Sequence, residues 1–312
     1  MTAPEDAGRA GEELLDVVVI GGSQAGLAMA WHLAQRHLRF AVLEAGPEIG
    51  HGWQSRWDSL TLFTPAQHDA LPGMAFPGPP DTYPGKDAVA GYLRAYAAAF
   101  DLPVKLNARV SDLSRTEEGF EIRTQVEVLR ARQVVVATGP FQVPFMPPAP
   151  QRLAGKDLFW WLTRLGLMRV TAGSRLGQRM SSREFIIGSS RRRLKAAAVR
   201  FRPAVAGADG RTVRFADGTS LDAAGVIWAT GYRSDYSWIH IPGVVGEGKV
   251  VHRRGVTEVP GLYFVGLSWQ HTRGSALLGF VNDDAAYLAG RITSQARATK
   301  AAASSPASQR SA

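Results

Sequence analysis

The chain contains no cysteine, although it is 312 residues long. Disulfides, thiolate metal sites, cysteine nucleophiles and redox-active cysteine pairs are therefore excluded. Any redox chemistry would need a bound cofactor, because no remaining side chain supplies it. The seven histidines are scattered along the chain without the spacing of metal ligands, so we predict no metal site.

Long apolar runs are also missing. No stretch reaches the roughly 18 consecutive apolar residues of a membrane-spanning helix, so we predict no transmembrane segment. The first fifteen positions, MTAPEDAGRAGEELL, lack the basic-then-apolar layout of a signal peptide, and we expect a cytoplasmic location. With 45% hydrophobic residues, the chain has enough core-forming side chains for one large or two modest domains.

Acidic residues are scarce in one region. Between Trp160 and Arg202 eleven Lys and Arg residues accompany a single acid, Glu184. Such a stretch is typical of a solvated basic face, and it also suits a phosphate-bearing cofactor, nucleic acid or an acidic membrane surface. No nucleic-acid recognition fold accompanies it, so we expect no nucleic-acid partner. Residues 1–14 and 297–312 have little to bury and are predicted to be disordered.

The sequence from 15 to 44 predicts a strand, a glycine turn, a helix and a second strand. Val17 to Ile20 is a short β-branched run, residues 24–36 carry apolar side chains at helical spacing, and Glu44 ends a second apolar run. This order is typical of a dinucleotide-binding unit, in which the helix N-terminus meets the pyrophosphate and the acid binds a ribose diol. Ser23 replaces the middle glycine of the fingerprint. The candidate cofactor-binding residues are Gly21, Gly22, Ser23, Gln24, Ala25, Gly26 and Glu44.

An Ala-Thr-Gly ending occurs twice, in VVVATGPF from Val134 and in VIWATGYR from Val226. Each follows a predicted β-hairpin, and the second hairpin has Asp217 and Gly218 at its turn. The small turn lets the backbone approach a nucleotide closely. Both endings resemble those of two-dinucleotide flavoproteins, in which each nucleotide-binding unit ends this way, so the resemblance implies two Rossmann-like units. Thr138 and Gly139 are the cofactor-binding candidates in the first ending.

The second unit has no matching beginning. Between Gly139 and Gly225 no three glycines form GxGxxG, and only Gly188 follows a strand-like run. A strand-helix-strand unit needs about thirty residues or more, so we interpret the gap as a lost element. The sequence from 158 to 202 predicts mainly helices, and the aromatic run at 159–161 predicts a partner surface or packing back onto the first domain.

Several stretches resemble the flavin-containing monooxygenases, especially the bacterial FAD/NAD(P)-dependent oxidoreductases near the plant YUCCA-type branch. They are GHGWQSRWDSLTLFTP, YPGKDAVAGYLRAYAAAFDLPV, both Ala-Thr-Gly phrases and PGLYFVGLSWQHTRGSALLGFVNDDAAYLA. The family's FxGxxxH motif and second fingerprint are missing. The resemblance implies an α/β fold of the two-dinucleotide flavoprotein type. In it, residues 15–147 with 225–296 form a Rossmann-like FAD-binding domain, and residues 148–224 are a helical, basic remnant of the NADPH-binding domain.

The resemblance also implies an FAD-dependent oxidoreductase. In the family NADPH reduces FAD, oxygen adds at the flavin C4a position, and the hydroperoxide passes one oxygen to a small organic substrate. Thr64 and His271 are the implied catalytic candidates, Trp269 and Arg273 lie on the same segment as His271, and Thr64 stands where many N-oxidising relatives have asparagine, which puts amine oxidation in doubt. The further cofactor-binding residues that the resemblance implies are Gly52, Trp53, Arg56, Leu62, Val110, Gly266 and Gly279.

The missing fingerprint leaves several interpretations open. The chain is a monooxygenase reduced weakly by NAD(P)H or by a separate reductase, or it is an oxidase or dehydrogenase reduced by its own substrate. It could instead be a non-catalytic flavoprotein that binds a reductase or a second copy through 158–202, or a deleted product that folds poorly. A further hypothesis has the Arg191 to Lys195 cluster meeting the 2′-phosphate of NADPH.

Overall fold

The computed structural model describes residues 14–139, 152–153, 156–157, 162–181, 191–225 and 234–304. The predictions made for residues 1–13 and 305–312 lie outside the described residues, as do those for the aromatic run at 159–161 and the second Ala-Thr-Gly phrase. None of the helices in the described part of the chain has the length and hydropathy needed to span a bilayer.

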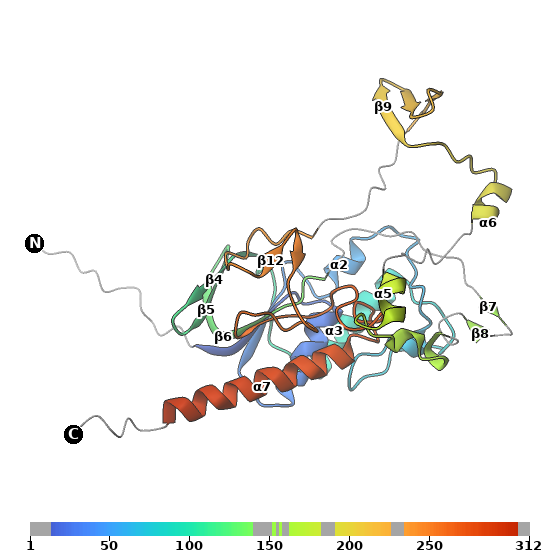
Figure 1. Cartoon of the computed structure of the whole chain (residues 1–312). Helices are drawn as coiled ribbons and strands as arrows, with labels where there is room; N and C mark the ends of the chain where they lie inside the picture. Colours follow the sequence, from blue (N-terminus) through green and yellow to red (C-terminus); the bar gives the residue numbers. More distant parts are fainter. Residues whose placement is uncertain are drawn as a thin grey trace, which may run out of the picture.

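A seven-stranded sheet lies at the centre of the main body (Figure 1). Its order is β3-β2-β1-β6-β5-β4, with β14 also paired to β6. The pairs among β1, β2, β3, β6 and β14 are parallel, whereas β4, β5 and β6 pair antiparallel. The strands are β1 (Leu15–Ile20), β2 (Phe40–Leu43), β3 (Val104–Lys105), β4 (Val110–Thr116), β5 (Gly119–Thr124), β6 (Val128–Val136) and β14 (Leu262–Phe264).

The strand β6 changes its neighbour along its length. Its first half, Val128 to Ala131, pairs antiparallel with β5, and its second half, Val134 to Val136, pairs in parallel with β14. β1 lies along the other side of the strand. The predicted strands before Gly21 and Glu44 are confirmed, as is the predicted hairpin before the first Ala-Thr-Gly phrase.

Hydrophobic side chains cover both faces of the sheet. In β1, Val17 and Val19 belong to a cluster with the helices, while Val18 and Ile20 belong to a second cluster with the β4–β5 hairpin and residues 236–244. This two-faced burial explains why the strand is a continuous apolar run. The helices of the main body are α1 (Gln24–Ala34), α2 (His51–Gln54), η1 (Ala66–His68), α3 (Lys86–Ala99) and α7 (Asn282–Ser304).

The last helix is longer than predicted. Residues from 297 onward were expected to be disordered, but α7 continues to Ser304. The helix is held against α1 by buried residues such as Leu288 and Ile292. The following segment, RATKAAAS, consists largely of good helix formers, so it extends a helix that packing has already nucleated. The prediction was therefore wrong for residues 297–304.

The region predicted to be a helical remnant contains strands as well as helices. Three of these strands form a separate sheet, β11-β10-β9, which stands apart from the main body in Figure 1. The predicted hairpin is confirmed, because β10 and β11 pair antiparallel around Asp217 and Gly218. The elements are β7 (Arg152–Leu153), β8 (Lys156–Asp157), η2 (Leu167–Arg169), α5 (Arg175–Ser181), α6 (Arg191–Ala196), β9 (Val205–Asp209), β10 (Thr212–Phe215) and β11 (Ser220–Asp222).

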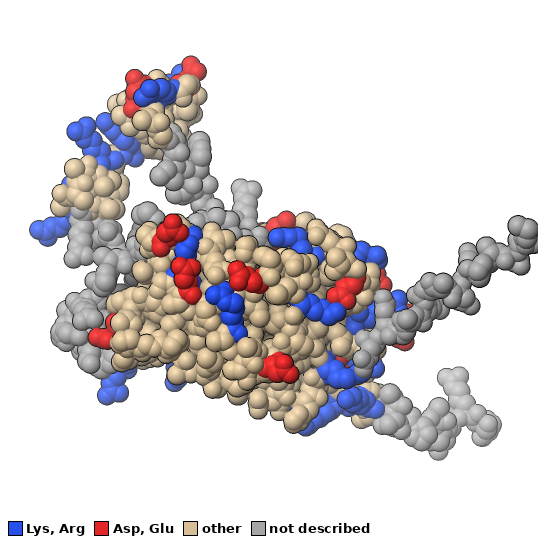
Figure 2. Space-filling model, turned by 180° about the vertical axis from the view of Figure 1, so that it is seen from behind, with Lys and Arg blue, Asp and Glu red and all other residues tan. Residues whose placement is uncertain are grey.

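Basic side chains lie on the outside of this region. Arg192, Lys195, Arg200 and Arg202 are all exposed. Figure 2 shows Lys and Arg gathered around α6 and the small sheet, at the upper left of that view. A short hairpin, β12 (Val245–Gly246) and β13 (Lys249–Val250), follows closer to the main body.

Candidate functional site

The carboxyl ends of three parallel strands meet at one edge of the sheet, where α/β folds bind their ligands. Gly21 follows β1, Thr138 and Gly139 come just after β6, and Gly266 follows β14. A methyl group placed on Gly21 would lie 2.7 Å from the Ala137 carbonyl oxygen. One placed on Gly266 would lie 2.7 Å from the Ala25 Cβ. The structure therefore brings these predicted positions together.

The glycine turn packs α1 tightly onto β1. A methyl group on Gly26 would lie 1.8 Å from the Gly21 carbonyl oxygen, so only glycine fits. Ser23 is the N-cap residue of α1, yet its side chain makes no capping hydrogen bond, and no acid occupies the first turn. The N-terminal N–H groups of α1 are thus left without a side-chain anion, which suits a bound pyrophosphate.

Glu44 is held against the glycine turn. One carboxylate oxygen accepts a hydrogen bond from the Gly22 N–H at 2.8 Å, and the other accepts one from the Gly46 N–H at 2.8 Å. A carboxylate has about four acceptor positions, so two remain for the hydroxyls of a ribose. The Ala108 N–H donates to the Glu44 carbonyl oxygen at 2.8 Å, just before Val110 opens β4.

The tryptophan loop is joined to the glycine turn through Gln24. The Trp53 indole N–H and the Ser23 hydroxyl both donate to the Gln24 side-chain oxygen, at 3.3 and 2.6 Å. The Gln24 amide nitrogen is thereby directed away from those two donors. The Arg56 Nε donates to the Gly52 carbonyl oxygen at 2.9 Å. Trp53 is thus placed beside the predicted pyrophosphate site, as part of one connected group.

The loop that carries Leu62 and Thr64 is clamped from two sides. The Leu62 N–H donates to the Pro84 carbonyl oxygen at 2.7 Å. A methyl group on Gly279 would lie 1.8 Å from the His68 carbonyl oxygen, so the approach to α7 presses on the same loop. Thr64 is 4% exposed, and its hydroxyl donates to the fully buried Asp69 at 2.5 Å. Sequence reasoning missed Asp69, although an acid within the otherwise uncharged run LFTPAQHDALPG was a signal.

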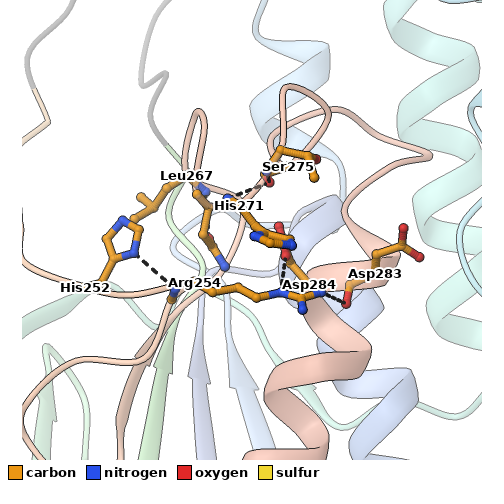
Figure 3. A network of polar contacts seen from close by, with 10 residues as sticks. His252, Arg254, Leu267, His271, Ser275, Asp283 and Asp284 are labelled. Atoms are coloured by element: carbon orange, nitrogen blue, oxygen red, sulfur yellow. Dashed lines mark hydrogen bonds and ion pairs between the residues drawn. The ribbon is translucent and has the colours of Figure 1, made fainter. Parts of the chain in front are cut away.

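Polar contacts fix the start of α7 (Figure 3). Arg254 reaches over it, pairing with the buried Asp284 carboxylate at 3.3 Å and donating to the Asp283 carbonyl oxygen at 3.4 Å. The Arg254 guanidinium also lies 4.1 Å from the centre of the Tyr287 ring. Burial lowers the pKa of the neighbouring His252, an effect that the Asp284 carboxylate opposes. Sequence reasoning did not identify this network.

The loop between β14 and α7 holds His271 mainly through its backbone. The His271 N–H donates to the Ser275 hydroxyl oxygen at 3.1 Å, and its carbonyl oxygen accepts a hydrogen bond from the Ala172 N–H at 2.7 Å. Thr171 forms an isolated antiparallel β-bridge with Thr272. Met168 is 1% exposed. Part of residues 148–224 therefore packs onto the main body, beside the segment that carries the predicted catalytic residue His271.

Comparison with known proteins places the chain in a family. Residues 18–154 match the family model described as pyridine nucleotide-disulphide oxidoreductase. An uncharacterized CzcO-like oxidoreductase of Geobacillus kaustophilus is 38% identical over 89% of this chain and 98% of its own length. The indole-3-pyruvate monooxygenase YUCCA1 of rice is 36% identical over 44% of this chain and 36% of its own length.

The relative from Geobacillus is longer than this chain within the matched region. The alignment runs over 340 residues but uses 89% of the 312 residues here, so about 60 of its positions have no counterpart in this chain. Among solved structures, a flavin-containing monooxygenase from Stenotrophomonas maltophilia is 25% identical, with a TM-score of 0.71, covering 91% of this chain and 99% of that one. The chain belongs to the CzcO-like oxidoreductases of the flavin monooxygenase family.

Proposed function

We propose that this protein is an FAD-dependent monooxygenase that transfers one oxygen atom from dioxygen to a small organic substrate. The observation that supports it most is the group of residues at the strand ends. There an uncapped helix N-terminus, a glycine turn and a carboxylate oriented by two N–H groups lie together. These features fit a dinucleotide that carries a pyrophosphate and a ribose.

Residues 15–147 with 225–296 would form the FAD-binding domain. The N–H groups at the start of α1 would bind the pyrophosphate, and the free acceptor positions of Glu44 would bind the ribose hydroxyls. Trp53, directed by Gln24, would cover this part of the cofactor. FAD, when bound, supplies the reductive activation of dioxygen that no side chain provides.

The loop before α7 would cover the reacting end of the cofactor. Its backbone is fixed by Ser275 and by the Thr171–Ala172 segment, and the network around Arg254 fixes the helix that follows it. A fixed loop of this kind would exclude water. An oxygen-transferring flavin requires this exclusion of water. The α7 N-terminus would direct partial positive charge toward this end of the site.

NADPH is expected to be a poor reductant. The sequence lacks the second glycine fingerprint, and about 60 positions of the Geobacillus relative have no counterpart here. We place this gap in the phosphate-binding head of the second unit, so that residues 148–224 are what remains of the NADPH-binding domain. A nicotinamide would then dock weakly, and a separate reductase or the substrate would supply the electrons.

The test does not depend on NADPH. The purified protein should show the visible absorbance of bound FAD, which is then reduced chemically without oxygen. Dioxygen labelled with oxygen-18 is admitted together with a thioether or a ketone, and the products are analysed by mass spectrometry. One labelled oxygen atom in the product supports a monooxygenase. A full equivalent of hydrogen peroxide with the added thioether or ketone unchanged would favour an oxidase instead, and a protein without FAD would contradict both.

A further inference from the structure

A buried acid lies in the loop between α2 and α3. Asp69 is fully buried, and the Thr64 hydroxyl donates to its Oδ1 atom at 2.5 Å. Its Oδ2 atom has no hydrogen-bond partner in the part of the chain that the structure describes. Burial raises the pKa of Asp69 to about 7, and the bond from Thr64 opposes this rise. Near neutral pH the carboxyl therefore exists in both protonation states.

Two titratable side chains, Tyr92 and His68, lie near Asp69. From α3, Tyr92 accepts a hydrogen bond from the Leu71 N–H at 2.7 Å and donates to the Met74 carbonyl oxygen at 2.8 Å, so its hydroxyl proton is already used. Burial raises the pKa of Tyr92, and the Asp69 charge raises it further. His68, the neighbour along the chain, stacks on Phe280 with ring centres 6.3 Å apart.

The charged side chains of α3 contact other groups or are exposed. On α3, Lys86 donates to Gln54, Arg56 and Asp58, Arg94 pairs with Glu48, and Asp87 is exposed. Residues 277–280, which press on the loop from the α7 side, carry no ionisable side chain. A change in the protonation of Asp69 therefore acts most directly on the hydrogen bond with Thr64.

Thr64 can take two hydrogen-bonding states. When Asp69 is ionised, the Thr64 hydroxyl donates its hydrogen bond to the carboxylate. Thr64 can then only accept a hydrogen bond from any other group. When Asp69 has taken up a proton from solvent, its O–H can donate to the Thr64 oxygen, and the Thr64 proton becomes available to another acceptor. One proton on Asp69 thus converts Thr64 from an acceptor into a donor.

The loop meets the segment before α7, because a methyl group on Gly279 would lie 1.8 Å from the His68 carbonyl oxygen. Ala66, Ala25 and Leu278 belong to the same large hydrophobic cluster. Trp53 and Leu62 pack against the same cluster. The hydrogen bonds that a flavin ring receives tune its electronic properties, so a change at Thr64 would be visible there.

We propose that Asp69 is a positioning residue whose protonation sets whether Thr64 donates or accepts a hydrogen bond at the bound flavin. This inference rests on the proposed FAD site. It adds a proton-dependent control to that site, and it explains why an acid stays in a position where burial is costly. Asp69 acts through Thr64 and does not itself contact the cofactor.

The test follows the visible absorbance of the FAD-bound protein between about pH 5 and pH 9. The wild-type spectrum should shift with one apparent pKa near 7. Asp69→Asn should remove the shift, because its amide donates to Thr64 at every pH. Thr64→Val should remove it as well, whereas Thr64→Ser, which keeps the hydroxyl, should retain it. Asp101→Asn is the matched control, since Asp101 is exposed with a φ of 47° that asparagine adopts easily, and it should titrate like the wild type.

The outcomes separate this inference from the proposed function. A protein that binds no FAD overturns the proposed function and the inference with it. A protein that binds FAD but shows no transition near pH 7 overturns the inference alone, as does an Asp69→Asn or Thr64→Val variant that titrates like the wild type. A purely structural role for Asp69 would lower FAD content or melting temperature in Asp69→Asn, and it would leave the pH transition of the remaining FAD-bound protein in place.

Discussion

Two glycines, one in the main body and one in residues 148–224, each lie against a backbone carbonyl at nearly the same distance. A methyl group on Gly26 would lie 1.8 Å from the Gly21 carbonyl oxygen, and one on Gly177 would lie 1.9 Å from the Thr171 carbonyl oxygen. Gly26 lies where α1 packs against the turn after β1, close to the uncapped N-terminus of α1 and to Glu44. Gly177 lies where the short α5 packs against the turn that precedes it. Close packing is present in both regions, but among the described residues only the first combines it with the groups proposed to bind a dinucleotide.

The largest expected effect comes from Gly26→Ala. The new methyl group meets backbone that cannot move without separating α1 from β1, so we expect a loss of at least about 3 kcal/mol in unfolding free energy and no bound FAD. Gly177→Ala should loosen α5 while FAD stays bound. Thermal melting and the ratio of FAD absorbance to protein absorbance measure both effects.

Gly91→Ala is the matched control for these two substitutions. Gly91 lies within α3, and a methyl group there meets no atom within 4 Å. Alanine should raise the unfolding free energy by about 0.5 to 1 kcal/mol, because it is the better helix former. If Gly177→Ala released FAD as completely as Gly26→Ala, the two regions would not differ as we describe.

The second effect concerns Glu44→Gln. The amide keeps one oxygen for the Gly22 or the Gly46 N–H but turns a donor toward the other, and it presents less negative charge to the ribose hydroxyls. We expect FAD affinity to fall about 100-fold, which corresponds to about 2.7 kcal/mol, with a melting temperature of the FAD-free protein close to that of the wild type. Fluorescence quenching on titration with FAD measures the affinity. Glu117→Gln, in the exposed turn between β4 and β5, should bind like the wild type, and an equal loss there would point to a general charge effect.

The third prediction compares valines in the two sheets. Val18 is fully buried in the main sheet, and Val205 in β9 is 52% exposed. Val18→Ala should lower the unfolding free energy by about 2 kcal/mol, since it leaves a cavity. Val205→Ala should change it by less than about 0.5 kcal/mol. Urea unfolding checks both values, and equal losses would show that the small sheet contributes to the same core.

The last prediction is a pH dependence of stability. The pKa of Asp69 is raised from 3.8 to about 7 in the folded chain, so the folded state binds the proton more tightly than the unfolded state. Stability is therefore lost as the pH rises from about 4 to about 7, and it stays reduced above that range. Asp69→Asn should be more stable than the wild type at pH 8, and the difference should disappear near pH 4. Melting curves across this range would contradict the assignment if the difference were independent of pH.

The sequence was sufficient to predict the first unit because its signals are local. A β-branched run, glycines at fixed spacing and an acid after the second strand each report a nearby backbone requirement, and the structure brings Gly21, Gly26 and Glu44 together as expected. The hairpin turn at Asp217 and Gly218 was also predicted from local residues. The end of α7 was wrongly predicted, because helix formers without apolar spacing were interpreted as disorder.

The features that escaped prediction depend on contacts between distant segments. Arg254 and Asp284 are 30 positions apart, and His271 meets Ala172 across about a hundred. No spacing rule joins such residues. Asp69 was missed for a different reason, since its importance comes from burial, which a single sequence does not report.

We propose that one nucleotide site is complete and that the second lacks its phosphate-binding head. Anaerobic stopped-flow addition of NADPH to the purified protein, followed at the visible absorbance of FAD, tests it most directly. We expect the bound FAD to be reduced slowly, at a rate that still rises with NADPH concentration at about 1 mM. Fast reduction that saturates at micromolar NADPH would show a complete second site and would contradict the account.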